Sequence, residues 1–451
     1  MNRINMMRTM ACALVAALLT SLAACGGGGG GSSSASATGN TTTNSGTTSS
    51  SSTSTSTTTT TSTTTSTSTL SSANPTAVPT ASTAANTVPV LVSVTQFNRA
   101  NSPMASVTVC TAGSNATSNC TTIDNVLVDT ESFGLRLFAS AIPSATLNTL
   151  NAQTSGSATV AECALFGSGY SWGTVRTADI KLGSEVGQNV PIQVMADSTL
   201  TASAPSDCQQ APAFAQPSDL GANGILGVGV APQDCGSRCV SNSPAGFYYA
   251  CSGTTCNVAN QPLAQQVGNP VQYFSTDNNG VVLEMPAVGT SGAASASGTL
   301  VFGIDTQSNN TLANTGATVL TTDSSGDFTA VYNGVTFSDN AFFDSGSTVL
   351  FFQDATIATN SLKYFVPSST LARSVAITGG NSVNATIDFN VANANTLFAT
   401  GNYAFNNLAS YLNATFDMGM PFFYGRHVYY GITGATSTGG GTGPYVAFTS
   451  S

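Results

Sequence analysis

Two short segments of this chain each present an aspartate in a setting where the two carboxyl groups could act together. The first, Asn125–Ser132, reads Asn-Val-Leu-Val-Asp-Thr-Glu-Ser, and the second, Phe342–Ser347, reads Phe-Phe-Asp-Ser-Gly-Ser. In each segment an apolar run typical of a β-strand ends in the aspartate, and small hydroxyl residues follow. The aspartates, Asp129 and Asp344, lie about 215 residues apart, which indicates a duplicated unit.

The chemistry open to such a pair is general acid–base catalysis. A strand delivers each carboxylate to a rigid turn, where neighbouring hydroxyls and amides fix its orientation. Two turns that face one another bring the carboxyl groups close enough to share one proton, because both cannot ionise readily at contact distance. The ionised group then activates a water molecule while the protonated group polarises a carbonyl. A single Asp-Ser-Gly-Ser turn is common in β proteins, so the hypothesis depends on the repetition.

The repeated element resembles the active-site motif of the pepsin-like aspartic proteases, which is apolar-apolar-Asp-Thr/Ser-Gly-Ser/Thr and occurs once in each of two lobes. Asp344–Ser347 matches this motif in full, whereas Asp129–Ser132 departs from it at Glu131. The resemblance implies that Asp129 and Asp344 are the catalytic pair. It also implies supporting roles for the residues that follow them. Thr130 and Ser345 would tie the two turns together. Ser132 and Ser347 would hydrogen-bond the outer carboxylate oxygens, and Gly346 is the motif glycine.

Further segments resemble the same family in the same order. Phe166–Gly173 resembles the flap hairpin, with Phe166 where the family has a tyrosine and with Gly167 and Tyr170 as further flap candidates. Asn223–Gly229 resembles the strand beneath the first active-site loop, and Gly298–Asp305 resembles the segment that joins the lobes. The stretch from Met420 to Phe448 resembles the closing strands of the second lobe.

These observations predict an all-β, two-lobed pepsin-like fold with a central cleft. The 451 residues are enough for two packed lobes, and short β-like runs alternate with Gly, Asn, Asp and Ser. We expect an N-terminal lobe over residues 89–303 and a C-terminal lobe over 304–451. Helical periodicity is scarce, with 142–150 and 262–267 as the better candidates. Within the family, the chain looks closest to an uncharacterised group of bacterial lipoproteins with that fold.

The N-terminus predicts export and a lipid anchor. Arg3 and Arg8 precede an apolar run, Met10–Leu22, which has the order of a secretory signal peptide and is too short for a permanent membrane span. The run ends in Leu-Ala-Ala-Cys, which resembles the lipobox of bacterial lipoproteins, so residues 1–25 would be the signal segment and Cys25 the lipidated residue. Gly26 after that cysteine favours the outer membrane. The alternative is an ordinary cleaved signal peptide with a chance cysteine.

Residues 26–88 are predicted to be a disordered tether. A glycine run, Gly26–Gly31, is followed by a tract dominated by Ser and Thr. Such a composition cannot bury enough apolar surface to offset the conformational entropy of folding. A flexible coil of about 60 residues would average roughly 40 Å from end to end.

Eight cysteines follow Cys25, and in an exported chain an even number indicates disulfides. Proximity in the sequence suggests Cys110–Cys120, Cys235–Cys239 and Cys251–Cys256, which leaves Cys163–Cys208. Other connectivities remain open at this point, because eight cysteines can pair in many ways.

The composition limits the alternatives. The formal net charge of −10 and the pI near 4.2 argue against nucleic acid as a partner. Because the single histidine is His427 and no Cys-x-x-Cys pair occurs, we expect no metal site. No phosphate-binding loop is apparent, so we expect no cofactor.

The sequence therefore predicts a lipid-anchored envelope protein that cleaves extended polypeptides by an aspartic mechanism. The departure from the motif is Glu131. Its Cβ would strain the backbone if the turn required a positive φ, and its carboxylate would inhibit catalysis if it entered the cleft. If that side chain points away, the amide geometry survives. The alternatives are a catalytically silent pepsin-like protein that binds peptides or envelope components, and an unrelated β-rich surface lipoprotein such as an adhesin.

Overall fold

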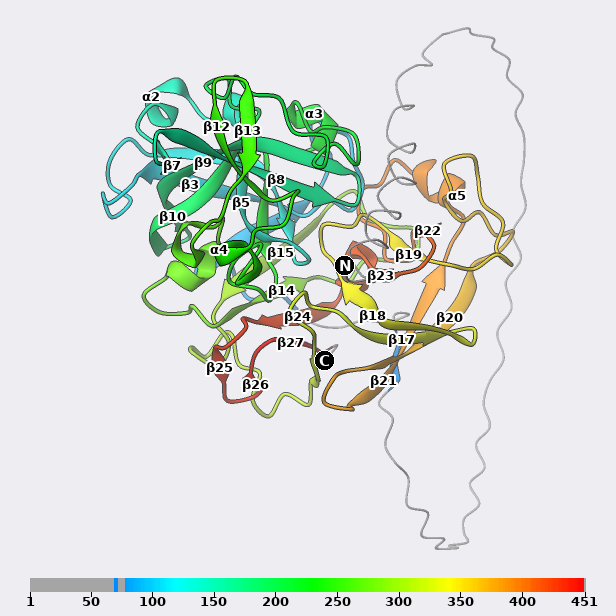
Figure 1. Ribbon diagram of the computed structural model, residues 1–451. Coiled ribbons are helices and arrows are strands. Elements are labelled where there is room, and N and C mark those ends of the chain that lie inside the picture. Colours follow the sequence, from blue (N-terminus) through cyan, green and yellow to red (C-terminus); the bar gives the residue numbers. More distant parts are fainter. Residues whose placement is uncertain (1–68, 72–77, 450–451) are drawn as a thin grey trace, which may run out of the picture.

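The computed structural model describes residues 69–71 and 78–449, and this part of the chain is an all-β protein (Figure 1). The predicted all-β class is therefore confirmed. The predicted signal segment, Cys25 and most of the predicted tether lie outside the described residues. Within the described residues, no helix combines the length and the apolar character that a transmembrane span needs.

Most strands of the first part of the chain belong to one closed sheet, which two late strands complete. Its strands are β2 (Thr87–Val92), β3 (Met104–Thr111), β4 (Thr121–Asp129), β5 (Phe133–Phe138), β6 (Asn151–Ala152), β7 (Thr154–Ser155), β8 (Ala158–Phe166), β9 (Gly169–Leu182), β10 (Glu185–Met195), β11 (Gly224–Val228), β12 (Tyr248–Ser252), β13 (Thr255–Val258), β14 (Gly280–Met285), β15 (Ala296–Phe302), β16 (Thr318–Thr321), β24 (Arg426–Gly431) and β27 (Tyr445–Thr449).

A second sheet has eight strands and holds most of the later part of the chain. Its strands are β1 (Thr69–Ser71), β17 (Phe328–Tyr332), β18 (Val335–Phe343), β19 (Leu350–Phe352), β20 (Leu371–Thr378), β21 (Asn384–Val391), β22 (Ala409–Tyr411) and β23 (Phe416–Met418). A small separate hairpin consists of β25 (Thr436–Ser437) and β26 (Gly441–Thr442). In Figure 1 the strands β3–β10 and the strands β17–β22 lie on opposite sides of the molecule.

The two sheets contain the same arrangement of five strands. In the closed sheet the order is β3-β4-β11-β5-β10, and in the second sheet it is β17-β18-β23-β19-β22. Corresponding neighbours also run in the same relative directions, with the third strand parallel to the one before it and antiparallel to the one after it. The duplication suggested by the two aspartate segments is thus a duplication of strand topology.

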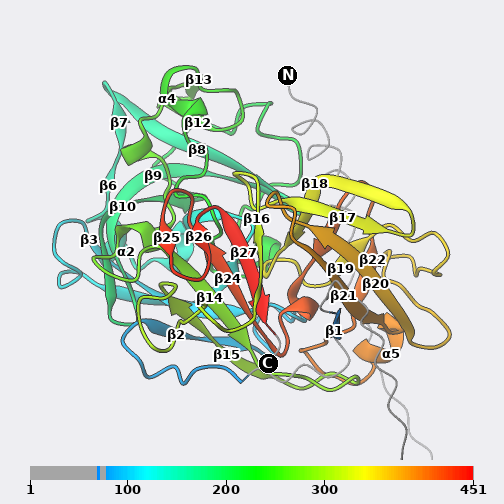
Figure 2. The same cartoon turned by 90° about the horizontal axis from the view of Figure 1, so that it is seen from below.

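The final strands of the chain return to the closed sheet. β24 pairs with β14 along the whole of both strands, and β27 pairs with β24 and with β16. Figure 2 shows β24 and β27 in the middle of the molecule. Of the two strands expected to close the later half, β24 therefore hydrogen-bonds to a strand of the earlier half, and β27 is joined to it at the edge of β24. The lobe boundary at residue 303 stays a prediction.

Burial patterns explain why these segments are strands. β21 alternates strictly between buried and more exposed residues, which is the pattern of a sheet with one face on the core. β14 is buried at every position because both of its faces are covered: Val281 and Leu283 pack into the main core, and Val282 packs into a second apolar cluster. The core of the second sheet is largely aromatic, with Tyr332, Phe352 and Phe416 packed at centroid distances of 5.1–5.5 Å.

Helices are short, as the scarcity of helical periodicity predicted. They are α2 (Ser144–Leu147), α3 (Pro217–Leu220), α4 (Arg238–Ser241) and α5 (Ala394–Phe398), with 3₁₀ turns η2 (Ala139–Ala141), η3 (Leu263–Gln265), η4 (Pro270–Tyr273) and η5 (Met420–Phe422). The segments 142–150 and 262–267 contribute only α2 and η3.

The folded part begins before residue 89. β2 starts at Thr87, and the buried Asn86 donates from Nδ2 to the Phe302 carbonyl at 2.9 Å. Further upstream, the Thr80 amide donates to Glu284 Oε2 at 2.5 Å. The last residues of the segment expected to be a tether are thus part of the folded structure.

All four suggested disulfides are present and therefore confirmed. They are Cys110–Cys120, Cys163–Cys208, Cys235–Cys239 and Cys251–Cys256.

Candidate active site

Two corresponding turns carry the aspartates. β4 ends at Asp129, and β18 ends at Phe343, one residue before Asp344. The chain reverses after each turn into β5 or β19. The third strand of each unit, β11 or β23, is bonded to both arms and so holds the turn in place.

The turn at Asp129 fixes both oxygens of its carboxylate. The Glu131 amide donates to Oδ1 at 3.0 Å, and the Ser132 hydroxyl donates to Oδ2 at 2.7 Å. The backbone of Glu131 is not in the left-handed region, so its Cβ carries no conformational penalty there. The departure from the motif glycine therefore leaves the backbone hydrogen bond intact.

The turn at Asp344 repeats this arrangement. The Gly346 amide donates to Oδ1 at 2.7 Å, and Ser347 Oγ lies 2.8 Å from Oδ2. Hydrogen bonds to a carboxylate stabilise its charged form and fix its orientation.

The two turns are tied to each other through buried hydroxyls. The Thr130 hydroxyl donates to the Phe343 carbonyl at 3.2 Å and accepts from the Ser345 amide at 2.9 Å. The Ser345 hydroxyl donates to the Val128 carbonyl at 2.7 Å. Tyr430 of β24 adds a bond from its hydroxyl to the Phe343 carbonyl at 2.9 Å. The hydroxyls singled out in the sequence thus link segments more than 200 residues apart.

The two carboxyl groups converge on one point beside Gly346. A Cβ at that glycine would lie 2.9 Å from Asp129 Oδ1 and 3.1 Å from Asp344 Oδ1, which explains why a side chain is excluded there. Burial, then the charge of Asp129, raises the pKa of Asp344 well above its ordinary value of 3.8, and a hydrogen bond with Asp129 acts in the same direction. The structure therefore brings the two predicted aspartates together, and burial beside Asp129 favours the protonated form of Asp344.

The Glu131 side chain is directed towards the loop between β16 and β17. A Cβ at Gly326 of that loop would lie 3.1 Å from Glu131 Oε2. Burial, then the charge of Asp344, raises the pKa of Tyr430 well above its ordinary value of 10, and the charges of Glu131 and Asp129 act in the same direction.

Residues 82–448 match the family described as "Protein of unknown function (DUF3443)". The chain belongs to this family. Its match includes both aspartate turns and all the strands that position them. A comparison with curated proteins finds no match.

The expected flap segment of this DUF3443 protein is a hairpin. β8 and β9 pair up to Phe166 and Gly169, and the Phe166 ring lies 5.9 Å from that of Phe214. Gly167, at the tip, would accept a Cβ without meeting any atom within 4 Å. Tyr170 is buried in a cluster with Cys163 and Cys208. That tyrosine is therefore part of the core beneath the hairpin.

A buried ionic network, which the sequence reasoning missed, anchors the strand that leaves the Asp129 turn. Arg136 of β5 donates from Nη2 to Glu162 at 2.5 Å and to Asp234 at 3.2 Å, and from Nη1 to the Phe133 carbonyl at 2.8 Å. Tyr248 donates to the other oxygen of Asp234 at 2.5 Å. Burial, then Glu162, raises the pKa of Asp234 well above 3.8. Charged residues scattered along a chain give no local signal of such a network.

A third carboxyl group beside the aspartates was also missed. Asp417, in the middle of β23, is buried, and its Oδ2 lies 2.6 Å from Ser347 Oγ. Burial, then the charge of Asp344, raises the pKa of Asp417 well above 3.8. Its flanking sequence, Phe-Asp-Met-Gly, contains no hydroxyl residue and so differs from the motif that revealed the other two.

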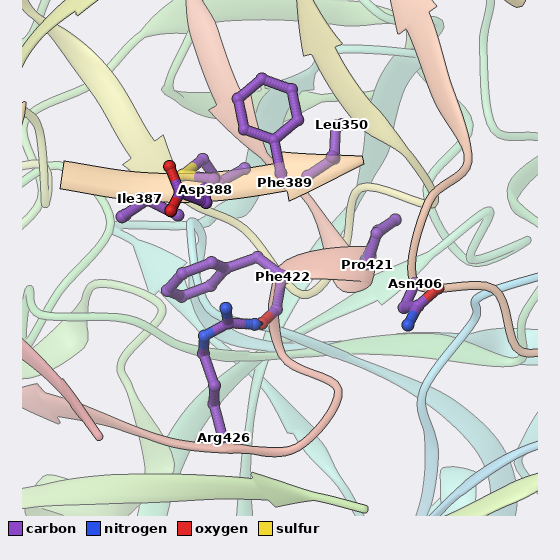
Figure 3. Close-up of a pocket in the computed structure, with 9 residues that line it drawn as sticks. Leu350, Ile387, Asp388, Phe389, Asn406, Pro421, Phe422 and Arg426 are labelled. Atoms are coloured by element: carbon purple, nitrogen blue, oxygen red, sulfur yellow. The ribbon is translucent and has the colours of Figure 1, made fainter. Parts of the chain in front are cut away.

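A small cavity is lined in part by Met418 of β23, and its lining includes none of the three carboxyl groups Asp129, Asp344 and Asp417. Figure 3 shows it lined by Phe422 and Arg426, among other residues, with the Arg426 guanidinium close to the Phe422 ring. The guanidinium carbon lies 4.6 Å from the ring centroid, and Nη1 donates to the Phe422 carbonyl at 2.5 Å. Burial lowers the pKa of Arg426 to about 10. This cation belongs to the core beneath the site.

Among the residues that the structure describes, no cluster of three or more His, Cys, Asp or Glu side chains has the arrangement of a metal site. The polar groups around the two aspartates are carboxyls, hydroxyls and backbone amides, which suit proton transfer.

Proposed function

We propose that this protein is an aspartic-type endopeptidase that cleaves extended polypeptides between two β lobes of a pepsin-like fold. The observation that carries the proposal is geometric. Two topologically equivalent turns place Oδ1 of Asp129 and Oδ1 of Asp344 at 2.9 and 3.1 Å from one point, the position of a Cβ at Gly346. A shared proton between two such carboxyl groups is the chemical requirement of this mechanism.

The hydrogen bonds suggest how the two carboxyl groups divide their roles. Asp344, whose pKa is raised by burial and by Asp129, donates its proton to the oxygen of the scissile carbonyl. Asp129 accepts a proton from the water molecule, whose oxygen attacks the carbonyl carbon. The resulting tetrahedral intermediate collapses when the proton held by Asp129 passes to the leaving nitrogen, and the proton taken from Asp344 returns to it.

The surroundings of the aspartates support a peptide-binding role. The β8–β9 hairpin has a solvent-accessible tip, where Leu165 is 40% exposed and Gly167 has open space around it. An exposed apolar side chain on a hairpin can cover the side chains of an extended substrate. The repeated five-strand unit agrees with a duplicated, two-lobed architecture.

The N-terminal sequence supports a location in the cell envelope. We propose an outer-membrane lipoprotein anchored through Cys25, with the segment after it as a spacer. The four disulfides agree with folding in an oxidising compartment.

The test uses the full chain, purified in detergent, and a denatured protein as substrate. Cleavage is measured at about pH 5, roughly one unit above the ordinary aspartate pKa. We expect cleavage that a statine-type transition-state mimic blocks. Asp129→Asn and Asp344→Asn should each lower kcat/KM by roughly 10³-fold, because each removes a proton-transfer group. Asp124→Asn, on the exposed face of β4, is the matched control and should cleave normally.

Full activity in the Asp344→Asn protein would exclude the two-aspartate mechanism. A wild-type protein that binds the statine mimic but cleaves nothing would favour the silent, peptide-binding alternative. That alternative draws its support from the Glu131 substitution and from the additional carboxyl group of Asp417.

A further inference from the structure

Asp417 lies directly behind the Asp344 turn. Its strand, β23, is inserted between β18 and β19, where Asp417 is opposite Phe342 on one side and Phe351 on the other. Ser347 Oγ bridges the two aspartates, at 2.8 Å from Asp344 Oδ2 and 2.6 Å from Asp417 Oδ2.

Hydrogen counting shows that this bridge needs an extra proton. A serine hydroxyl has one hydrogen and can donate to only one of two carboxyl oxygens. If both aspartates were ionised, one of the two short contacts would set a hydroxyl oxygen against a carboxylate with no hydrogen between them. One of the aspartates must therefore donate a proton to Ser347 Oγ.

The surroundings indicate that Asp417 is the donor. Its Oδ1 is buried and has no hydrogen-bond partner, so an ionised Asp417 would have a desolvated, unbonded oxygen. Asp344 Oδ1, in contrast, accepts the Gly346 amide. The ionisable groups that act on Asp417 are Asp344 and Asp129, and their charge opposes its ionisation.

No cation compensates Asp417 from the elements packed against it in the described chain. The paired positions on β18 and β19 are phenylalanines. Arg426 of β24 is directed to the Phe422 carbonyl and ring, as Figure 3 shows.

We propose that Asp417 is a positioning residue. It is a neutral acid that donates its proton to Ser347 Oγ, so that the single hydroxyl hydrogen of Ser347 is donated to Oδ2 of Asp344. The chain Asp417–OH, Ser347–OH, Asp344 forms a polarised series in which each bond strengthens the next. Asp344 thus keeps Ser347 as a fixed hydrogen-bond donor. Because Asp417 is neutral, it adds no second negative charge beside Asp344 to that of Asp129.

The corresponding position in the described part of the first half has no carboxyl group. In the first half, Gly227 of β11 is paired with Asp129. In the second half, Met418 of β23 is paired with Phe343, so the next residue, Gly419, is level with Asp344 and corresponds to Gly227. Two residues before each glycine stand Ile225 and Asp417, respectively. The two catalytic carboxyl groups are therefore inequivalent, because Asp344 is backed by Asp417, whereas the corresponding residue behind Asp129 is Ile225. This inference rests on the proposed function for its catalytic consequence, but the protonation of Asp417 stands on its own.

The experiment compares Asp417→Asn, which keeps a neutral donor of the same shape, with Asp417→Leu, which has no donor. The first readout is the number of protons released on thermal unfolding at about pH 6, from calorimetry or from the dependence of Tm on pH. A carboxyl group whose pKa is raised by folding stabilises the fold at low pH, and this contribution is lost as pH rises through the folded-state pKa. Both variants should therefore release about one proton fewer than the wild type.

The second readout is peptidase activity. Asp417→Asn should keep kcat/KM within about threefold of the wild-type value with the same pH profile, since its amide donates to Ser347. Asp417→Leu should lose roughly 10- to 100-fold, the range for groups that orient a reacting residue. In a Ser347→Ala background, Asp417→Leu should cause no further loss, because the bridge is already absent.

Unchanged proton release in Asp417→Asn would show that Asp417 is ionised and would overturn the proposal. So would equal activity losses in the Asn and Leu variants, or a further loss in the Ser347→Ala background, since either result indicates a packing role. If the wild type cleaves nothing, the proposed function fails, yet the proton count still decides whether Asp417 is the neutral donor.

Discussion

At the scale of single residues, Glu131 shows how a departure from a motif can be tolerated. Its amide donates to Asp129 at 3.0 Å, as the Gly346 amide donates to Asp344, and its backbone is outside the left-handed region. The backbone strain anticipated for this side chain therefore does not arise, and its carboxylate is directed to the loop at Gly326. The acid that shares a hydrogen-bonding serine with Asp344 is Asp417.

We expect Glu131→Gly to change kcat/KM by no more than about threefold, because the hydrogen bond that the site uses comes from the backbone. The pH profile should also stay in place. The matched substitution Gly346→Ala should lower activity strongly, since its Cβ would lie 2.8 Å from Asp129 Cγ. Steady-state kinetics of both variants checks this. A large gain in rate on Glu131→Gly would mean that the glutamate inhibits the wild-type enzyme.

At the scale of elements, the β8–β9 hairpin depends on a covalent link to a long loop. Cys163 of β8 is joined to Cys208, 45 residues away, whereas Cys235 and Cys239 are only 4 residues apart. A disulfide that closes a longer loop removes more conformational entropy from the unfolded chain.

Replacing Cys163 and Cys208 by serine should lower the free energy of unfolding by about 4 kcal/mol, against about 2 kcal/mol for the Cys235 and Cys239 pair. Chemical denaturation of the two double variants measures both values. Equal losses would show that native-state contacts, and not loop closure, determine the contribution of the longer bridge.

At the scale of the whole molecule, the two sheets are held together by chain segments that cross between them. β24 and β27 join the closed sheet although the second sheet precedes them in the chain. Near the N-terminus, β1 pairs in parallel with β21 of the second sheet, and the Val78 carbonyl lies 3.0 Å from His427 Nε2 of β24. The chain thus contacts both sheets before it enters β2.

The lipid anchor is testable at this scale. Cys25→Ser should move the protein from the membrane fraction to the soluble fraction, because the lipid would be its attachment. Cys12→Ser, within the same N-terminal segment, should stay membrane-bound. Fractionation and mass spectrometry of both variants measure this. A Cys25→Ser protein as tightly bound as the wild type would contradict the anchor.

The sequence by itself determined the features whose partners are close along the chain. Each aspartate and the groups that bind its oxygens lie within four residues, so both turns were visible as motifs. Three of the four disulfides close loops of ten residues or fewer, and the fourth followed by elimination. Short β-like runs separated by Gly, Asn, Asp and Ser, together with the scarcity of helical periodicity, were enough to predict an all-β chain.

Only the tertiary structure decided which distant groups meet these motifs. Asp417 reaches Ser347 across 70 residues of chain because β23 inserts between β18 and β19. Likewise the direction of Glu131 depends on a loop almost 200 residues further on. The register of strands far apart in the chain is set by the packing of the whole core, and a local pattern contains no information about it.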